Sequence, residues 1–108
     1  MTLSEVAYQI DGELKIETVN DQGAVYKATL LDNMRDPAIV KYRGDHTRPS
    51  DTEAIAIGMT ESEALQKLVD LLKGNILEFR FPIMWTDYSQ ILRIPITLTV
   101  DSVVPARV

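Results

Sequence analysis

The sequence contains no cysteine and a single histidine among its 108 residues. Because cysteine thiolates form disulfides, act as nucleophiles and bind most structural zinc ions, sites of these three kinds are excluded. One histidine cannot supply the paired ligands of a metal-binding motif, and neither a phosphate-binding loop nor a nucleophile elbow is present. We therefore predict a protein that is not an enzyme and that needs no cofactor or metal. A hydrolase that uses His46 is a remote alternative.

Long apolar runs and an excess of basic residues are absent as well. No segment approaches the roughly 18 apolar residues that span a bilayer, and residues 1–5 lack the basic start of an export signal. We therefore expect a cytoplasmic protein without a membrane partner. Sixteen acidic and eleven basic residues give a net charge of −5. That charge argues against broad nucleic-acid binding, which needs clustered lysine and arginine, and it suits a protein partner with a basic surface.

The chain has the length and composition of one domain. It contains no internal repeat, low-complexity tract or linker, and 45% of its residues are hydrophobic. We predict a single α+β domain over residues 1–108, with a mainly antiparallel sheet of about five to seven strands and one amphipathic helix packed on a face. A C-terminal β-hairpin completes it.

Alternating patterns and turn residues predict the strands of the first half. Residues 6–10 and 13–19 alternate on either side of Asp11 and Gly12, a dipeptide typical of the type I′ turn, so we predict a hairpin there. Runs of β-compatible residues between turn signals predict three further strands. These lie at residues 24–31, 38–42 and 54–58.

The clearest element is an amphipathic helix over residues 60–73. Thr60 and Glu63 have the spacing of a capping box, in which the threonine hydroxyl accepts the N–H three residues further on. Apolar residues recur on one side of the segment with the helical period, and charged residues occupy the other side. Lys73 suits the C-terminal end of the helix dipole, and Gly74 can adopt the left-handed conformation that ends many helices.

Period-two alternation returns in residues 77–83 and 92–100. We predict that the two runs pair as a hairpin with Ile83 opposite Leu92. The proline in each run must then lie where a backbone N–H would point away from the hairpin partner, because proline has no N–H. The hairpin either belongs to the main sheet or projects from it as an arm.

The strands before the predicted helix and the motif that opens it carry a family resemblance. Residues 58–65 read Gly-Met-Thr-Glu-Ser-Glu-Ala-Leu, which is similar to the Gly-x-Thr-x-x-Glu-Ala-Leu pattern of HicB-like antitoxin domains. The likeness covers residues 24–74. It implies a curved sheet followed by a helix, and an antitoxin-like or inhibitor-like role. A capped amphipathic helix after a strand also produces these letters for purely structural reasons.

The loop of residues 41–51 is the densest set of groups that could bind an anion, because it contains Arg43, His46 and Arg48. A guanidinium group can bind a carboxylate or phosphate through two parallel hydrogen bonds, and imidazole changes its charge near neutral pH. We name these three as candidate ligand-binding residues for an anionic small molecule. A solvated loop whose opposite charges pair locally is the alternative.

A second candidate site lies at the predicted tip of the C-terminal hairpin, where Met84, Trp85 and Tyr88 gather. These residue types are enriched in the cores of protein interfaces, so we predict an interface there. The alternative is that Trp85 folds back over the sheet as a local lid. One helix covers only part of so many strands, so we also expect a homo-oligomer in which a second subunit covers the rest.

Together, these patterns predict that the protein is a small cytosolic, non-enzymatic binding protein that acts through protein–protein contacts and self-association. The alternative is a small-molecule binder that holds an anionic ligand with the loop of residues 41–51.

Overall fold

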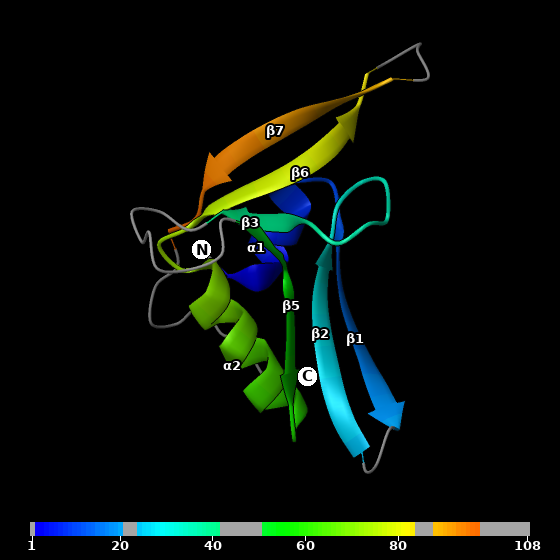
Figure 1. Ribbon diagram of the computed structural model, residues 1–108, viewed down its shortest axis with the longest axis vertical. Coiled ribbons are helices and arrows are strands. Elements are labelled where there is room, and N and C mark those ends of the chain that lie inside the picture. The colour runs from blue at the N-terminus through cyan, green and yellow to red at the C-terminus, as the bar shows by residue number, and fades with distance from the viewer. Residues whose placement is uncertain (1, 21–23, 42–50, 84–87, 98–108) are drawn as a thin grey trace.

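Two helices and seven strands make up the part of the chain that the computed structural model describes, residues 2–20, 24–41, 51–83 and 88–97 (Figure 1). The helices are α1 (Leu3–Gln9) and α2 (Glu61–Leu72). The strands are β1 (Glu13–Asn20), β2 (Ala24–Leu31), β3 (Ile39–Lys41), β4 (Asp51–Glu53), β5 (Ile55–Gly58), β6 (Ile76–Pro82) and β7 (Ser89–Pro95). Every pairing between these strands is antiparallel. The predicted α+β fold, mainly antiparallel sheet with an amphipathic helix, is confirmed.

The strands form two sheets, whereas the alternation predicted one. β1, β2 and β5 make a three-stranded sheet, and β4, β3, β6 and β7 make a four-stranded sheet, each in that order. The chain changes sheets at Ala54, between β4 and β5, where it bends. Leu30 N donates to Ala54 O at 3.0 Å, Ala54 N donates to Ala38 O at 2.8 Å, and Ala38 N donates to Leu30 O at 2.9 Å. All three residues are buried, and the two alanines allow backbones to approach this closely.

The predicted long helix is confirmed as α2, which packs against β2 and β5 (Figure 1). The Thr60 hydroxyl accepts the backbone N–H of Glu63 at 3.0 Å, so the predicted cap is present. Gly74, just beyond the end of the helix, has a φ of +79°. In the described part of the chain, neither helix is long and apolar enough to cross a membrane. The buried stripe of α2 consists of Ala64, Leu65, Leu68, Val69 and Leu72.

The predicted strand over residues 6–10 is wrong, because this segment belongs to α1. Thr2 caps the helix by accepting the backbone N–H of Glu5 at 3.2 Å. Five residues of alternation were too short a window to reveal a helical period that begins before them. The buried residues that show this period are Leu3, Val6, Ala7 and Ile10.

Asp11 and Gly12 end α1 instead of turning a hairpin. Asp11 N donates to Tyr8 O at 3.1 Å, and Gly12 N donates to Ala7 O at 2.8 Å. This pair of bonds is the Schellman motif, and Asp11 supplies its left-handed residue with a φ of +52°. A Cβ at Gly12 would overlap the carbonyl oxygen of Leu31. The dipeptide therefore provides the positive φ that its sequence predicts, but at a helix end.

The C-terminal hairpin is present, but its predicted register is wrong. Leu92 lies opposite Phe79 and not opposite Ile83, a shift of four residues along β6. Because the shift is even, every apolar side chain stays on its predicted face. The observed register also shortens the connection, since Ile83 N donates to Tyr88 O at 3.0 Å. A shorter loop costs less closure entropy.

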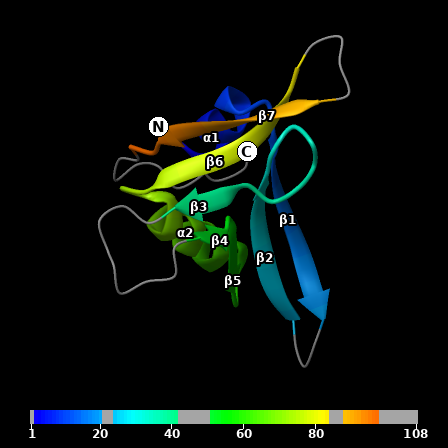
Figure 2. The same ribbon diagram turned by 45° about the horizontal axis from the view of Figure 1, so that its top comes forward.

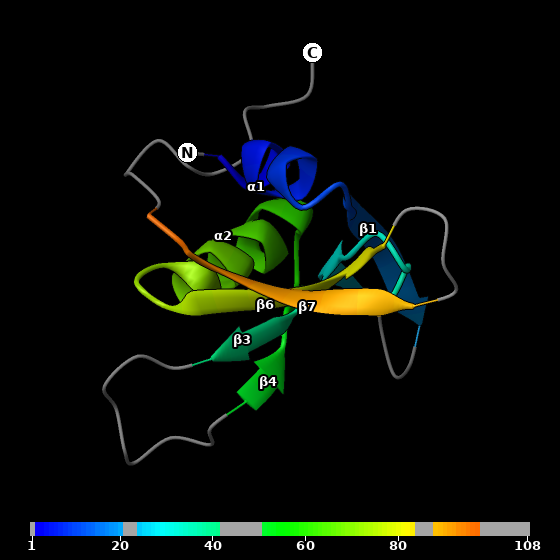
Figure 3. The ribbon, with the colours of Figure 1, turned by 90° about the horizontal axis from the view of Figure 1, so that it is seen from above.

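Both helices lie on one side of the four-stranded sheet (Figures 2 and 3). The core between them and the sheets is built from large side chains without solvent exposure. The largest of these are Leu3, Ile10, Leu30, Leu68, Leu72 and Leu77. The opposite face of the four-stranded sheet, which we call the outer face, is not covered by any described element.

Candidate functional site

Strand alternation and register decide which side chains occupy the outer face. In β6, Phe79 points into the core, so Glu78 and Arg80 point outward. The pairings of β3 place Ile39 between Glu53 on β4 and Glu78 on β6. A row of one apolar and two acidic residues therefore crosses three strands.

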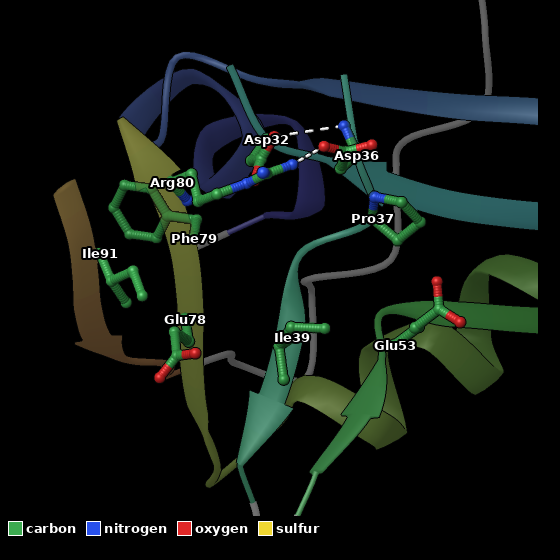
Figure 4. Close-up of a pocket in the computed structure, with 9 residues that line it drawn as sticks. All are labelled: Asp32, Asp36, Pro37, Ile39, Glu53, Glu78, Phe79, Arg80 and Ile91. Atoms are coloured by element: carbon green, nitrogen blue, oxygen red, sulfur yellow. Dashed lines mark hydrogen bonds and ion pairs between the residues drawn. The ribbon is translucent and has the colours of Figure 1, made fainter. Parts of the chain in front are cut away.

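A pocket of about 390 Å³ opens on the outer face beside this row (Figure 4). Its volume lies in the range of about 300 to 1,000 Å³ that is usual for ligand sites. Among the described residues, four carboxylates and one guanidinium line it, which gives this part of the lining a net charge of −3. We call it the acidic pocket. Its charged residues are Asp32, Asp36, Glu53, Glu78 and Arg80, and its other lining residues are Pro37, Ile39, Phe79 and Ile91.

Asp32 is the buried anchor of the pocket, with 3% of its side chain exposed. Its Oδ1 accepts the backbone N–H groups of Met34 at 2.9 Å and Asp36 at 3.2 Å. Its Oδ2 accepts the backbone N–H of Arg80 at 3.1 Å. A carboxylate that accepts several backbone N–H groups is held in one orientation. Asp32 thus joins the loop between β2 and β3 to β6.

Arg80 closes one end of the acidic pocket. Figure 4 shows its side chain turned toward Asp32 and Asp36. The guanidinium forms an ion pair with Asp36, and its Nε lies 3.7 Å from Asp32 Oδ2. Arg80, the one cation among the described lining residues, is therefore paired with two of the four carboxylates.

Glu78 is held by cations at the opposite side of the pocket. Its Oε2 lies 2.7 Å from Arg93 Nε and 3.5 Å from Lys41 Nζ. Lys41 also donates a hydrogen bond to Asp51 at 3.0 Å, and this bond, with the charge of Glu78, raises the pKa of the lysine above its usual value. Lys41 therefore carries its positive charge at neutral pH.

Glu53 differs from the other three carboxylates. It is exposed, and it has no hydrogen bond or ion pair with any residue that the structure describes. In the same described ranges, no group of three or more potential ligands is arranged to hold a metal ion. The pocket thus combines an unpaired negative charge with apolar walls, and this chemistry favours binding of a cation that has an apolar stem.

None of the site residues predicted from the sequence is among the described residues that line this pocket. Arg43, His46 and Arg48 lie outside the described residues, as do Met84 and Trp85. The remaining one, Tyr88, directly precedes β7 and is 76% exposed. Both predicted sites therefore stay predictions.

Sequence reasoning missed the acidic pocket because its residues come from four separate segments. The Asp36-Pro37 pair indicated only a break in the chain, and Glu78 and Arg80 indicated only the solvent side of a strand. The contact of Asp32 with Arg80 spans 48 residues and has no local sequence signal. The available signal was the placement of opposite charges at alternate positions of β6.

Comparisons of the chain with protein-family models, curated proteins and solved structures find no match. The resemblance to HicB-like antitoxin domains therefore stays a prediction. The structure does explain its motif locally. A Cβ at Gly58 would lie 2.5 Å from the backbone nitrogen of Ala64, and Thr60 caps α2. Close packing and capping alone require these residue types.

Proposed function

We propose that this chain is a small non-enzymatic binding protein that acts through protein–protein contacts, and that its acidic pocket receives a lysine or arginine side chain of a basic partner. The observation that carries the proposal is the carboxylate of Glu53, which lies in the pocket and has no ion pair with any described residue. The other three carboxylates of the described lining already have cationic partners in Arg80, Lys41 and Arg93. Net charge of −5 over the whole chain adds long-range attraction for a basic surface.

The shape of the pocket supports a side chain with a charged end and an apolar stem. Ile39, Pro37 and Ile91 provide apolar contact for the methylene groups, while Glu53 lies at one side for the ammonium or guanidinium. Lysine and arginine bury their stems along apolar surface while the charged head stays at the rim. A small anion would instead meet an excess of carboxylates here.

An inhibitor-like or antitoxin-like role would use the same contact, since either kind of protein acts by covering a surface of its partner. The resemblance of residues 24–74 motivates this narrower proposal. Binding of an anionic metabolite by Arg43, His46 and Arg48 is a separate proposal. It predicts that replacing both arginines with alanine abolishes such binding and leaves the fold intact.

The test uses short capped peptides that differ at one central residue, which is lysine, arginine, norleucine or glutamate. NMR titration near neutral pH should shift the backbone amides of Ile39, Glu78 and Ile91 with the lysine and arginine peptides only. Norleucine keeps the stem and removes the charge, so it separates electrostatic from apolar binding. Equal shifts with norleucine, or no shift with any peptide at millimolar concentration, would refute the proposal.

Two variants locate the contact. Glu53→Gln should weaken binding of the lysine peptide by up to about fivefold, because an exposed ion pair contributes about 0.2 to 1 kcal/mol. Glu17→Gln removes the same charge from β1 of the other sheet and should leave the affinity unchanged. Equal loss of affinity in both variants would indicate a general effect of net charge and not a contact in the pocket.

A further inference from the structure

The outer edge of β7 is defined by two hydrogen bonds that flank the β6–β7 ladder. Ile83 N donates to Tyr88 O, and Ile96 N donates to Asn75 O, each at 3.0 Å. In an antiparallel ladder, hydrogen-bonded pairs recur at every second residue. Even-numbered residues of β7 therefore bond to β6, and the backbone groups of the odd-numbered residues point away from it.

Three residues consequently offer both N–H and C=O to the outside: Ser89, Ile91 and Arg93. β7 pairs only with β6 among the described strands. The fourth odd-numbered residue, Pro95, offers only its carbonyl. It is the last residue of β7, and its missing N–H costs the β6–β7 ladder nothing, because an N–H at this position would point away from β6.

The edge strands β1, β4 and β5 have charges, short lengths or a packed helix that discourage pairing with a further strand, whereas β7 has few such features. β1 presents alternating charges at Glu13, Lys15 and Glu17, β4 has three residues of which two are acidic, and β5 has four residues and packs against α2. β7 has seven residues, and Ile91, the middle one of the three that offer both N–H and C=O to the outside, is 58% exposed. Its one charged side chain, Arg93, is turned inward to Glu78 at 2.7 Å. Long edges without charge or bulges are templates for strand addition.

We propose that β7 is the self-association edge of this protein and that it pairs antiparallel with β7 of a second copy. The register places Ile91 opposite its own symmetry mate and Ser89 opposite Arg93 of the other copy. All three outward N–H groups then find carbonyl acceptors. A two-fold axis at Ile91 satisfies both copies with the same surface, as a closed dimer requires.

Side-chain complementarity favours a second copy in this register. No charged residue faces a like charge, because Arg93 meets serine and Ile91 meets isoleucine, which is a favourable cross-strand pair. Pro95 falls beyond the last of the three pairs, so its missing N–H interrupts nothing. The exposed Ile91 side chains would shield one another from water.

The dimer would join the two four-stranded sheets into one sheet of eight strands. Ile91 also lines the acidic pocket, so two pockets would open on the same face near the two-fold axis. A partner with two basic side chains could then bind both pockets, which raises affinity without new contacts. The inference goes beyond the pocket itself, since β7 can pair whether or not the pocket binds a basic side chain.

The test is sedimentation equilibrium of the parent, Ile91→Lys, Ile91→Glu and an equimolar mixture of these two variants. The parent should be dimeric, and each variant alone should dissociate at least about tenfold more readily, because like charges face each other across the axis. The mixture should recover a heterodimer, because lysine then faces glutamate. Met59→Lys, a comparable change at another exposed apolar residue, should not alter the dimer.

Several outcomes would overturn the proposal: a parent that is monomeric at every concentration, a dimer unaffected at Ile91, or a mixture that stays monomeric while the parent dimerises. Loss of the dimer in Trp85→Ser with Tyr88→Ser, but not in Ile91→Lys, would place the interface at the hairpin tip instead.

Amide exchange in the parent is a second measurement, and it does not depend on any variant folding. The Ile91 and Arg93 amides should be protected in the dimer and exchange rapidly on dilution to monomer. Glu53→Gln changes the acidic pocket and leaves the β7 edge unchanged, so failure of the pocket proposal can be distinguished from failure of the dimer proposal.

Discussion

Asp32 Oδ2 accepts the backbone N–H of Arg80 at 3.1 Å, and so a side chain takes the place of a neighbouring strand at the edge of β6. β3 pairs with β6 through Ile39 and Glu78 and then ends. Two residues further along β6, the next N–H on that side belongs to Arg80. The following one would belong to Pro82, which has none. Along this edge of β6, a strand thus pairs with the first residue and a carboxylate accepts the N–H of the second. The third residue is a proline, which has no N–H that needs an acceptor.

The first prediction concerns Asp32→Asn. Asparagine keeps the shape but replaces one carboxylate oxygen with an amide NH₂, which cannot accept the N–H groups that Asp32 now binds. We expect the free energy of unfolding to fall by about 1 to 3 kcal/mol, the cost of leaving a buried donor without its acceptor. Chemical denaturation measures it. Asp36→Asn, at an exposed ion pair, should change stability by about 1 kcal/mol or less. Equal effects of the two changes would contradict the anchoring role.

The second prediction compares two glycines. Gly12→Ala should be the more destabilising change, because the new Cβ would overlap the carbonyl oxygen of Leu31, which is backbone and cannot move alone. Gly74→Ala meets no atom within 4 Å but keeps a φ of +79°, so it should cost only the left-handed penalty of about 1 to 2 kcal/mol. Thermal unfolding of the pair gives the order. A reversed order would show that the chain at Gly12 can shift freely.

The third prediction tests α1, the helix that sequence patterning missed. Thr2→Ala removes the acceptor for the Glu5 N–H and should cost about 0.5 to 2 kcal/mol, as should Thr60→Ala at α2. Serine at either position retains the hydroxyl and should restore most of the loss. If Thr2→Ala has no effect while Thr60→Ala does, α1 does not depend on this cap.

The fourth prediction concerns Lys41, whose pKa is raised above its usual value of 10.5, chiefly by the hydrogen bond to Asp51. A raised pKa means that the folded state binds the proton more tightly than the unfolded state does. The stabilisation is therefore complete below pH 10.5 and is lost as pH rises through the higher folded pKa. Lys41→Met should unfold more easily than the parent at neutral pH. The gap should narrow in alkaline solution, and a gap that does not change with pH would contradict the assignment.

Local patterns predicted the elements whose signals lie within one turn or one strand. The cap at Thr60, the stripe of α2 and the faces of β6 and β7 all follow from spacing of residues near one another. The same patterns could not decide the register of β6 and β7, because a shift by an even number of residues leaves the faces unchanged. They also could not divide one sheet into two, since the division depends on Ala38 and Ala54 meeting Leu30.

The candidate site was less predictable than the fold. The acidic pocket requires that Asp32, Glu53 and Glu78 come together from segments that are distant in sequence. No periodic pattern in the sequence indicates that these segments lie side by side. Charge at these positions is equally compatible with separate solvated surfaces. Only the pairing of β3 with both β4 and β6 brings the carboxylates to one place.

The ring of backbone hydrogen bonds among Leu30, Ala38 and Ala54 has a consequence for how the molecule opens. Each of the three residues donates to one neighbour and accepts from the other, and none can be released without exposing the buried ends of both sheets. Partial opening that frees one sheet and preserves the other is therefore disfavoured, and the two sheets should behave as a single cooperative unit. Amide exchange at these three positions should consequently proceed only through global unfolding, at rates set by the stability of the whole domain.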